Sequence, residues 1–123
     1  MEKNCLQIML DNQNKLQERV GTSPLNLPTR ERMQFIKEHS FWVIDEIHEM
    51  VHELPFMKYW SKKHDNLTDE ELELLIEAGK KEFIDVLTFL MNVGLGLGFT
   101  GEEMMEEYLS KNCENHRRQD NGY

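Results

Sequence analysis

Two pairs of acidic residues have the types and the spacing that could bind a metal ion. Glu46 and Glu49 lie in "VIDEIHEMVHEL". Glu82 and Asp85 lie in "EFIDVLTFLMNV". Residues three apart share one face of a helix, so each pair predicts a helical face with two carboxylates. Four carboxylates that meet between two helices cannot all stay ionised without cations. Mg²⁺ suits such a site, because it prefers oxygen ligands and accepts substrate phosphates as further ligands.

The surroundings of Glu82 and Asp85 make this pair unusual. Most of the residues from 83 to 91 are apolar, and a helix that is apolar almost all round is normally buried. A buried carboxylate is costly unless it is paired or bound to a metal. The ExxE spacing of Glu46 and Glu49 is by itself common on solvated helix surfaces. The inferred metal site therefore depends on the two pairs facing each other.

Helical periodicity and turn-forming residues predict the first two helices. A first helix is expected over residues 2–19, followed by a loop that contains Pro24 and Pro28. The next helix should start near Arg30 and end or kink at Pro55. This second helix carries the first acidic pair.

Capping boxes predict two later helices. Thr68 and Thr100 are each followed three residues later by a glutamate, which is the pattern of a threonine N-cap. The helix from Thr68 leads to the second acidic pair, and Gly79 leaves open whether it is continuous. The glycines within residues 94–98 predict its end. The polar tail from Cys113 onwards is expected to be extended.

No stretch of the sequence predicts a β-strand, so the expected fold is all-α. We expect a single domain over residues 1–123, built as a small bundle of four to five helices. Several helices carry broad apolar faces in this short chain, so the bundle is expected to be completed by dimerisation.

Composition argues against several classes of protein. The chain has 14 Lys and Arg against 23 Asp and Glu, a net charge of −9, whereas nucleic-acid-binding domains normally show a basic face. Cys5 and Cys113 lack the spacing of a zinc site or a disulfide framework. The N-terminal sequence lacks the apolar core of a signal peptide, and the apolar run 86–99 is too short to cross a membrane. The expected protein is soluble and cytoplasmic, in the host cytoplasm if a phage encodes it.

The order of the two acidic pairs resembles that of the all-α nucleotide pyrophosphohydrolases, a superfamily that includes MazG-like enzymes and dimeric dUTPases. The C-terminal sequence "YLSKNCENHRRQDNGY" is similar to the tail signature of dimeric dUTPases and phage dCTP pyrophosphatases. "KYWSKK" resembles their lysine-and-tryptophan segment, and "MLDNQNKLQERV" resembles their first helix, which reads the pyrimidine. The short chain, ending in Gly-Tyr, looks most like the phage dCTPase/dUTPase branch.

The resemblance implies a role for each matched residue. The implied magnesium ligands and catalytic residues are Glu46, Glu49, Glu82 and Asp85. The implied substrate-binding residues are Gln13, Gln17, Lys58, Trp60, Lys111, Asn112, Asn115, Arg118 and Tyr123. Gln13 and Gln17 would contact the base. Lys111, Arg118 and Tyr123 would hold phosphate oxygens, in a tail that is mobile until substrate binds. Thr88 departs from the pattern, because many relatives have histidine there.

The resemblance implies a Mg²⁺-dependent enzyme that hydrolyses dUTP, dCTP or both to the monophosphate and pyrophosphate; enzymes of this kind also accept diphosphates. Two or three Mg²⁺ ions are expected per site, with Mn²⁺ as a substitute. Glu49 is expected to orient or deprotonate the attacking water. A glutamine carboxamide can read the edge of either pyrimidine, so the sequence does not separate uracil from cytosine.

Three alternatives remain open from the sequence. One is a MazG-like enzyme that accepts a broader range of nucleoside triphosphates. Another is a ferritin-type di-metal bundle, which needs an ExxH motif on two helices. Glu49 and His52 form one such motif, but the helix of Asp85 offers no histidine. The third is a helical dimer that binds a ligand without catalysis. Outside a metal site, His48 and His52 are expected to be helix-surface residues.

Overall fold

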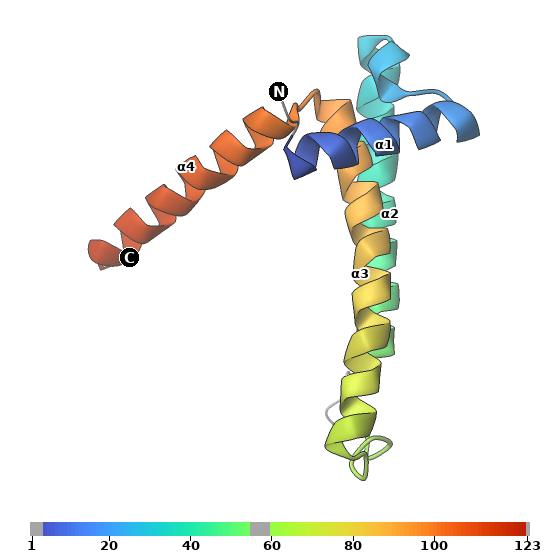
Figure 1. Ribbon diagram of the computed structural model, residues 1–123, viewed down its shortest axis with the longest axis vertical. Helices are drawn as coiled ribbons and strands as arrows, with labels where there is room; N and C mark the ends of the chain where they lie inside the picture. Colours follow the sequence, from blue (N-terminus) through green and yellow to red (C-terminus); the bar gives the residue numbers. More distant parts are fainter. Residues whose placement is uncertain (1–3, 55–59, 123) are drawn as a thin grey trace.

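The computed structural model describes residues 4–54 and 60–122, and the described chain consists of helices and short connections (Figure 1). The elements, in order, are α1 (Cys5–Val20), the 3₁₀ turn η1 (Pro24–Asn26), α2 (Thr29–Glu53), α3 (Asp69–Leu97) and α4 (Gly101–Asp120). No strand occurs in these described ranges, which confirms the predicted all-α fold. None of the described helices is long and apolar enough by itself to span a membrane, although the bent pair of α3 and α4 passes that test by length and composition.

Local sequence signals account for most helix ends. Thr68 forms a complete capping box with Glu71 at the start of α3, as predicted. Thr100 accepts a hydrogen bond from the Glu103 N–H at the start of α4. The helix α2 ends just before Pro55, in agreement with the predicted stop. Helix α3 runs through Gly79 without a break, which settles the question of its continuity.

The last helix differs from the predicted one. The tail from Cys113 was expected to be extended, but α4 continues to Asp120, so this prediction is wrong. Glu114 accepts two hydrogen bonds from the guanidinium of Arg117, one of them at 2.8 Å from Nε, and lies 3.4 Å from Nε of Arg118. Such i,i+3 and i,i+4 pairs support a helix, and basic residues in its last turn interact favourably with its dipole.

Helices α2 and α3 form a long antiparallel pair that carries both acidic pairs (Figure 1). A buried polar contact joins them, because the Asn92 side-chain amide lies 3.1 Å from Nδ1 of His39. The His39 ring stacks on Phe35 and lies edge-on to Trp42. Burial lowers the pKa of His39, so its neutral form is favoured in the fold. This contact fixes the register between α2 and α3 some distance from the acidic pairs.

The most deeply buried cluster lies where α1 crosses α3 near the start of α4. It consists of Leu10, Met91 and Leu95, with Leu6, Met9, Leu87 and Met104 packed around them. Gly101 brings α4 into direct contact with α1, since its N–H donates a 2.7 Å hydrogen bond to Oε1 of Gln7. A Cβ at this position would lie 2.4 Å from the Gln7 backbone nitrogen. Only glycine fits this contact.

We expect Gly101→Ala to destabilise the protein by about 1–3 kcal/mol, the range typical of overpacking. The added methyl group would meet backbone atoms of α1, which cannot move as a side chain can. The melting temperature should fall by several degrees. Gly21→Ala is the matched control, because a Cβ there meets nothing closer than 4.0 Å and its backbone is extended. Equal melting of Gly101→Ala and the parent chain would contradict this account.

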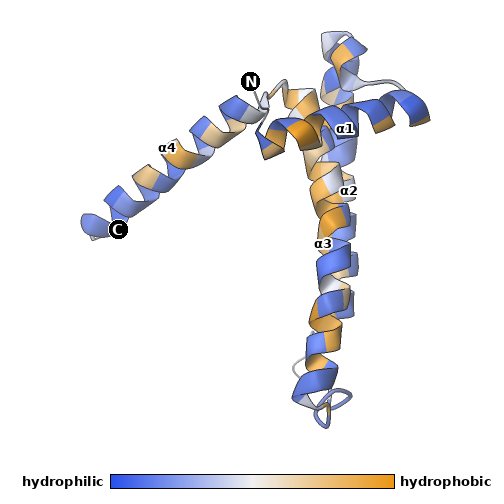
Figure 2. Cartoon of the chain, viewed as in Figure 1, coloured by the Kyte–Doolittle hydropathy of each residue, from blue (hydrophilic) through white to orange (hydrophobic). Residues whose placement is uncertain are grey.

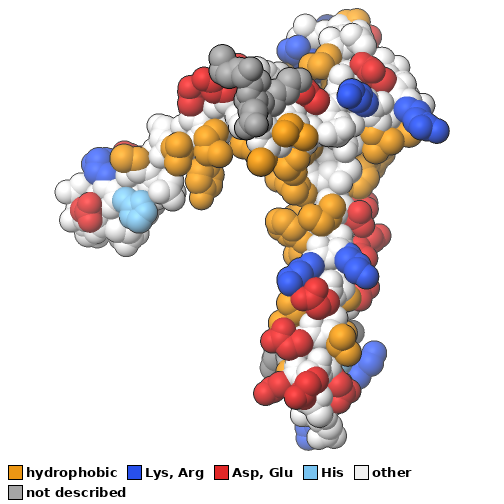
Figure 3. Space-filling view, viewed as in Figure 1, with side chains coloured by type: hydrophobic (Ala, Val, Ile, Leu, Met, Phe, Trp, Pro, Cys, Tyr) orange, Lys and Arg blue, Asp and Glu red, His pale blue; other side chains and the backbone are white. Residues whose placement is uncertain are grey.

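Much apolar surface remains exposed on the described chain. Tyr108 is 66% exposed, Phe41 65% and Ile84 56%. Among the described elements the backbone of α4 comes close only to that of α1, and Met104 in its first turn reaches the α3 residues of the core. The rest of α4 extends away from the chain with apolar residues along its length (Figure 2). Figure 3 shows apolar side chains gathered on the inner side of the angle between α3 and α4. A single chain therefore leaves a substantial part of its apolar surface unburied, and dimerisation remains a prediction.

Candidate metal and nucleotide site

The structure brings the two predicted acidic pairs together across α2 and α3. One carboxylate oxygen each of Glu46, Glu49 and Glu82 lie within 4.8 Å of one another. Asp85 is close enough that its charge raises the pKa of both Glu46 and Glu82. These four residues form the acid cluster. Oxygen ligands at this spacing could be bridged by a hard divalent cation.

Electrostatics in the acid cluster favour a bound cation. Burial, followed by the charges of Glu49 and Asp85, raises the pKa of Glu46. Burial and then the charges of Asp85, Glu49 and Glu53 raise the pKa of Glu82. Oε2 of Glu46 is shielded from solvent and has no hydrogen-bond partner among the described residues. A shielded carboxylate oxygen without a partner is unfavourable, so the donor set fits a magnesium ion.

Without metal, the protein should become more stable as the pH is lowered from neutral. A carboxyl group whose pKa is raised by folding binds its proton more tightly in the folded state than in the unfolded state. Its stabilising contribution is therefore complete below the ordinary carboxyl pKa and is lost as the pH rises through the raised pKa. Melting temperatures in EDTA should rise between pH 7.5 and pH values near the ordinary carboxyl pKa.

Two substitutions distinguish the effect of the acid cluster on melting from the effect of the net charge of the protein. Glu46→Gln should melt higher than the parent at pH 7.5 in EDTA and should show a weaker pH dependence. The control is Glu73→Gln, which removes one negative charge from an exposed position on α3. If Glu73→Gln flattens the pH profile as much as Glu46→Gln does, net charge rather than the cluster is responsible.

A groove of about 400 Å³ lies between α1 and α3. It is lined by Ile8, Met9, Asn12, Gln13, Leu16, Ile84, Leu87, Thr88 and Met91. The predicted base-contacting Gln13 belongs to this lining, whereas Gln17 lies one turn further along α1 and outside it. Ile84 adjoins Asp85 in the chain, and Thr88 follows Asp85 by about one turn. The α3 wall of the groove therefore comes within about one helical turn of Asp85, and its lining is mostly apolar with few polar groups.

Sequence reasoning missed several of these residues. The apolar walls of the groove come from α1 and α3, and no spacing rule shows that these two helices cross. Asn12 could have been noticed as the neighbour of Gln13, and its side-chain amide donates a 2.9 Å hydrogen bond to the Ile8 carbonyl. Glu53, one turn beyond Glu49, adds to the charge that raises the pKa of Glu82.

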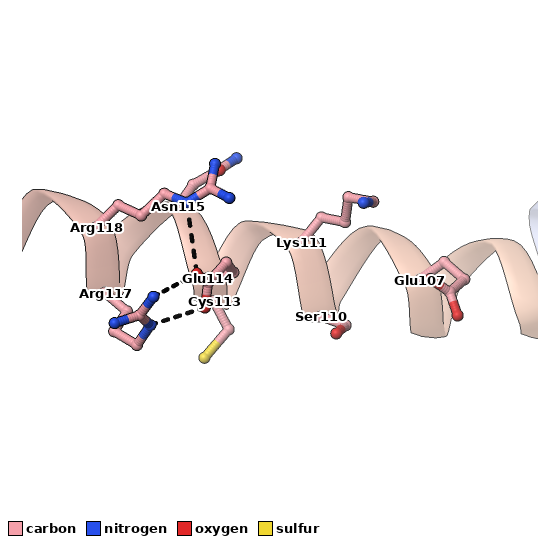
Figure 4. A pocket seen from close by; sticks show the side chains of 8 residues that line it. All are labelled: Glu107, Ser110, Lys111, Cys113, Glu114, Asn115, Arg117 and Arg118. Carbon is pink, nitrogen blue, oxygen red and sulfur yellow. Dashed lines mark hydrogen bonds and ion pairs between the residues drawn. The ribbon is translucent and has the colours of Figure 1, made fainter. Parts of the chain in front are cut away.

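The predicted phosphate-binding residues lie on α4. Figure 4 shows Lys111, Asn115 and Arg118 on one side of this helix and Arg117 on the other, as expected for positions i, i+4 and i+7. They line an open surface that belongs to α4 alone. Asn112 is exposed on the same helix. The chain turns by 101° between α3 and α4, and the surface that these residues line includes none of the four residues of the acid cluster.

The remaining predicted residues are less informative. Lys58 and Tyr123 lie outside the described residues. Trp60 is largely exposed at the α2–α3 connection. His48 and His52 are exposed on α2, as expected, with their Nε2 atoms 3.0 Å apart.

Comparisons with known proteins agree with the resemblance seen in the sequence. The family described as dUTPase matches residues 5–97 and 74–123. The dCTP pyrophosphatase of Enterobacteria phage T4 is 31% identical, over 99% of this chain and 84% of that protein. The dCTP pyrophosphatase of Enterobacteria phage LZ5 is 30% identical, over 96% of this chain and 82% of that protein. No solved structure gives a significant match.

Proposed function

Because the chain belongs to the dUTPase family, and is a nucleoside triphosphate pyrophosphatase on that ground, we propose that it hydrolyses the deoxypyrimidine nucleotides dCTP and dUTP to the monophosphate and pyrophosphate with Mg²⁺. The observation that carries this proposal is the acid cluster, with its unpartnered Glu46 oxygen, beside an apolar groove that contains Gln13. The names of the phage relatives support dCTP, and the name of the family supports dUTP.

The acid cluster would supply the chemistry of hydrolysis. Mg²⁺ held by Glu46, Glu49, Glu82 and Asp85 would neutralise charge on the phosphate chain and lower the pKa of the attacking water. Glu49 is exposed at the edge of the cluster, and an oxygen of it that is not used as a ligand can accept the proton of that water. Any negative charge that develops on the phosphates is then stabilised by fixed groups rather than by solvent.

The groove would hold the base. Its walls of Ile8, Leu16 and Leu87 offer apolar surface to the faces of a pyrimidine ring. The carboxamide of Gln13 has both a donor and an acceptor, so it can pair with the polar edge of cytosine or of uracil. A Gln13 carboxamide that meets the edge of a single ring would be displaced by the second ring of a purine.

A panel of all deoxynucleoside triphosphates and UTP, with product identification, tests the proposal. We expect kcat/KM for dCTP or dUTP to exceed that for dATP and dGTP by about a hundredfold or more. Pyrophosphate should be released with Mg²⁺, with Mn²⁺ as a weaker substitute, and the reaction should stop in EDTA. Equal rates on purine nucleotides would instead assign the protein to the broader MazG-like enzymes. Release of orthophosphate would exclude a pyrophosphatase reaction.

The proposed active species is a homodimer. The exposed apolar side chains of α2, α3 and α4 support this, because soluble monomers rarely expose contiguous apolar surface of this kind. Light scattering coupled to gel filtration would give the mass of the particle. A monomer that is fully active at assay concentration would exclude this part of the proposal.

A further inference from the structure

Two histidines on α2 form a close pair outside the acid cluster. His48 and His52 are four residues apart, so they lie one above the other on one face of the helix. Both side chains are exposed. Their Nε2 atoms are 3.0 Å apart, and their ring centroids are 4.3 Å apart with the ring planes nearly perpendicular. The two Nε2 atoms therefore lie close enough to bind one metal ion together.

The chemistry of this pair differs from that of the acid cluster. In the absence of a metal, a hydrogen bond between the two Nε2 atoms requires one ring to donate and the other to accept. When both rings carry their hydrogen on Nδ1 instead, both Nε2 lone pairs can bind a cation. Imidazole is a good ligand for Zn²⁺, Cu²⁺ and Ni²⁺, whereas Mg²⁺ prefers oxygen. The pair is therefore suited to a metal other than that of the acid cluster.

The histidine pair also faces a different direction from the acidic residues of α2. At 100° per residue, the midpoint of His48 and His52 lies roughly 110° around the helix from the midpoint of Glu46 and Glu49. One ion could therefore occupy each face. The carboxylates of the acid cluster still concentrate cations near this part of α2, because their negative field extends over the surrounding surface.

The number of protein ligands limits the type of site. The sequence "HEMVH" has the H-E-x-x-H spacing of helical zinc sites, but catalytic zinc sites have three protein ligands. Within residues 4–54 and 60–122, the three potential ligands close enough to share an ion are Glu46, Glu49 and Glu82, and this group includes neither histidine. The histidine pair therefore offers two ligands, with water in the remaining positions.

The distance between the two nitrogens indicates the preferred metal. With metal–nitrogen bonds of about 2.0–2.1 Å, donors 3.0 Å apart form an angle of roughly 95° at the metal. Tetrahedral Zn²⁺ would hold the same donors about 3.3 Å apart. An angle close to 90° is typical of the square-planar and tetragonal sites of Cu²⁺ and Ni²⁺. The geometry therefore favours these two ions over Zn²⁺.

We propose that His48 and His52 form a second cation site, which binds one Cu²⁺ or Ni²⁺ ion per chain independently of the acid cluster. Binding requires neither a nucleotide nor Mg²⁺, so this site goes beyond the proposed function. The bound ion connects two adjacent turns of α2. Because the pair has its spacing only in the folded helix, metal binding stabilises the folded state.

Titration calorimetry of the untagged protein with Ni²⁺, in excess Mg²⁺, tests the proposal. We expect one Ni²⁺ per chain, removed by EDTA, and a melting temperature that rises by several degrees when Ni²⁺ is added. His48→Ala and His52→Ala should each weaken binding by about tenfold or more, because a single imidazole lacks the advantage of a second, linked ligand. Zn²⁺ should bind more weakly than Ni²⁺.

Two control variants make the result specific. His64→Ala removes a histidine that has no other histidine or cysteine within four positions, and Asp85→Asn alters the acid cluster; both should bind Ni²⁺ as the parent does. Circular dichroism checks that each variant is folded. The proposal is overturned if the parent binds no stoichiometric Ni²⁺, or if either histidine variant binds it as tightly as the parent. Loss of Ni²⁺ binding in Asp85→Asn would overturn it by placing the ion in the acid cluster. Tighter binding of Zn²⁺ than of Ni²⁺ would overturn the assigned geometry.

Discussion

Asp85→Asn is expected to abolish hydrolysis of dCTP and dUTP while raising the melting temperature of the metal-free protein. The substitution removes a ligand from the proposed Mg²⁺ site, and metal-ion stabilisation of a transition state is worth several kcal/mol, so kcat should fall by about a thousandfold or more. The same carboxylate raises the pKa of Glu46 and Glu82. Replacing it with a neutral amide relieves this repulsion in the absence of cations.

The two effects are measured separately. Activity is followed with saturating Mg²⁺, and melting is followed in EDTA. Glu73→Gln serves again as the control, because it removes a charge from α3 outside the cluster; its activity should match that of the parent. An Asp85→Asn enzyme that retains normal turnover would exclude the cluster as the catalytic metal site. A large loss of stability in EDTA would show that Asp85 has a structural partner instead.

Deletion of residues 117–123 is expected to reduce kcat/KM by about a hundredfold or more and to change the melting temperature little. The loss of activity follows from the removal of Arg118, because a guanidinium that grips phosphate in the transition state contributes several kcal/mol. The small effect on melting follows from the structure, in which the end of α4 contacts no other described helix. Residues 117–120 of this segment are helical rather than extended, so circular dichroism should record a small loss of helix.

Single substitutions refine this result. Arg118→Ala should raise KM and lower kcat together, since a phosphate clamp contributes to substrate binding and to transition-state stabilisation. Arg117→Ala is the matched control, because Arg117 points to the opposite side of α4 and pairs with Glu114 (Figure 4). If the truncated chain turns over dCTP and dUTP at the parent rate, the tail does not bind substrate.

Local chemistry made much of the fold predictable. Thr68 and Thr100 cap helices through hydrogen bonds to residues three positions away, so a short window of sequence contains the whole signal. The acidic pairs were visible for the same reason, since Glu46 and Glu49 must share a helix face wherever the helix lies. The pairing of α2 with α3 was expected only as the condition under which the two acidic pairs could bind one metal site.

Features that depend on distant contacts were not predictable. The direction of α4 depends on the hydrogen bond between Gly101 and Gln7. The spacing of apolar residues in the sequence does not predict this bond. The polar composition of the tail predicted an extended segment, whereas the pairs of Glu114 with Arg117 and Arg118 favour a helix. Both Gln13 and Gln17 were predicted to contact the base, whereas only Gln13 lines the groove. That distinction depends on how α1 crosses α3.

The hydrogen bond from Gly101 to Gln7 also has a consequence for the order of events during synthesis. It joins residues 94 positions apart, so it closes a loop that encompasses most of the chain, and contacts of such high sequence separation form late because their loop entropy must be overcome first. Helices α2 and α3 can pair as soon as both have left the ribosome. Helix α1, made first, can bury its apolar face only once the second half of α3 supplies Met91 and Leu95, and its position is completed when Gly101 arrives. Until then that face is exposed and competes for other partners, which makes a nascent chain stalled before the end of α3 the species most prone to aggregate.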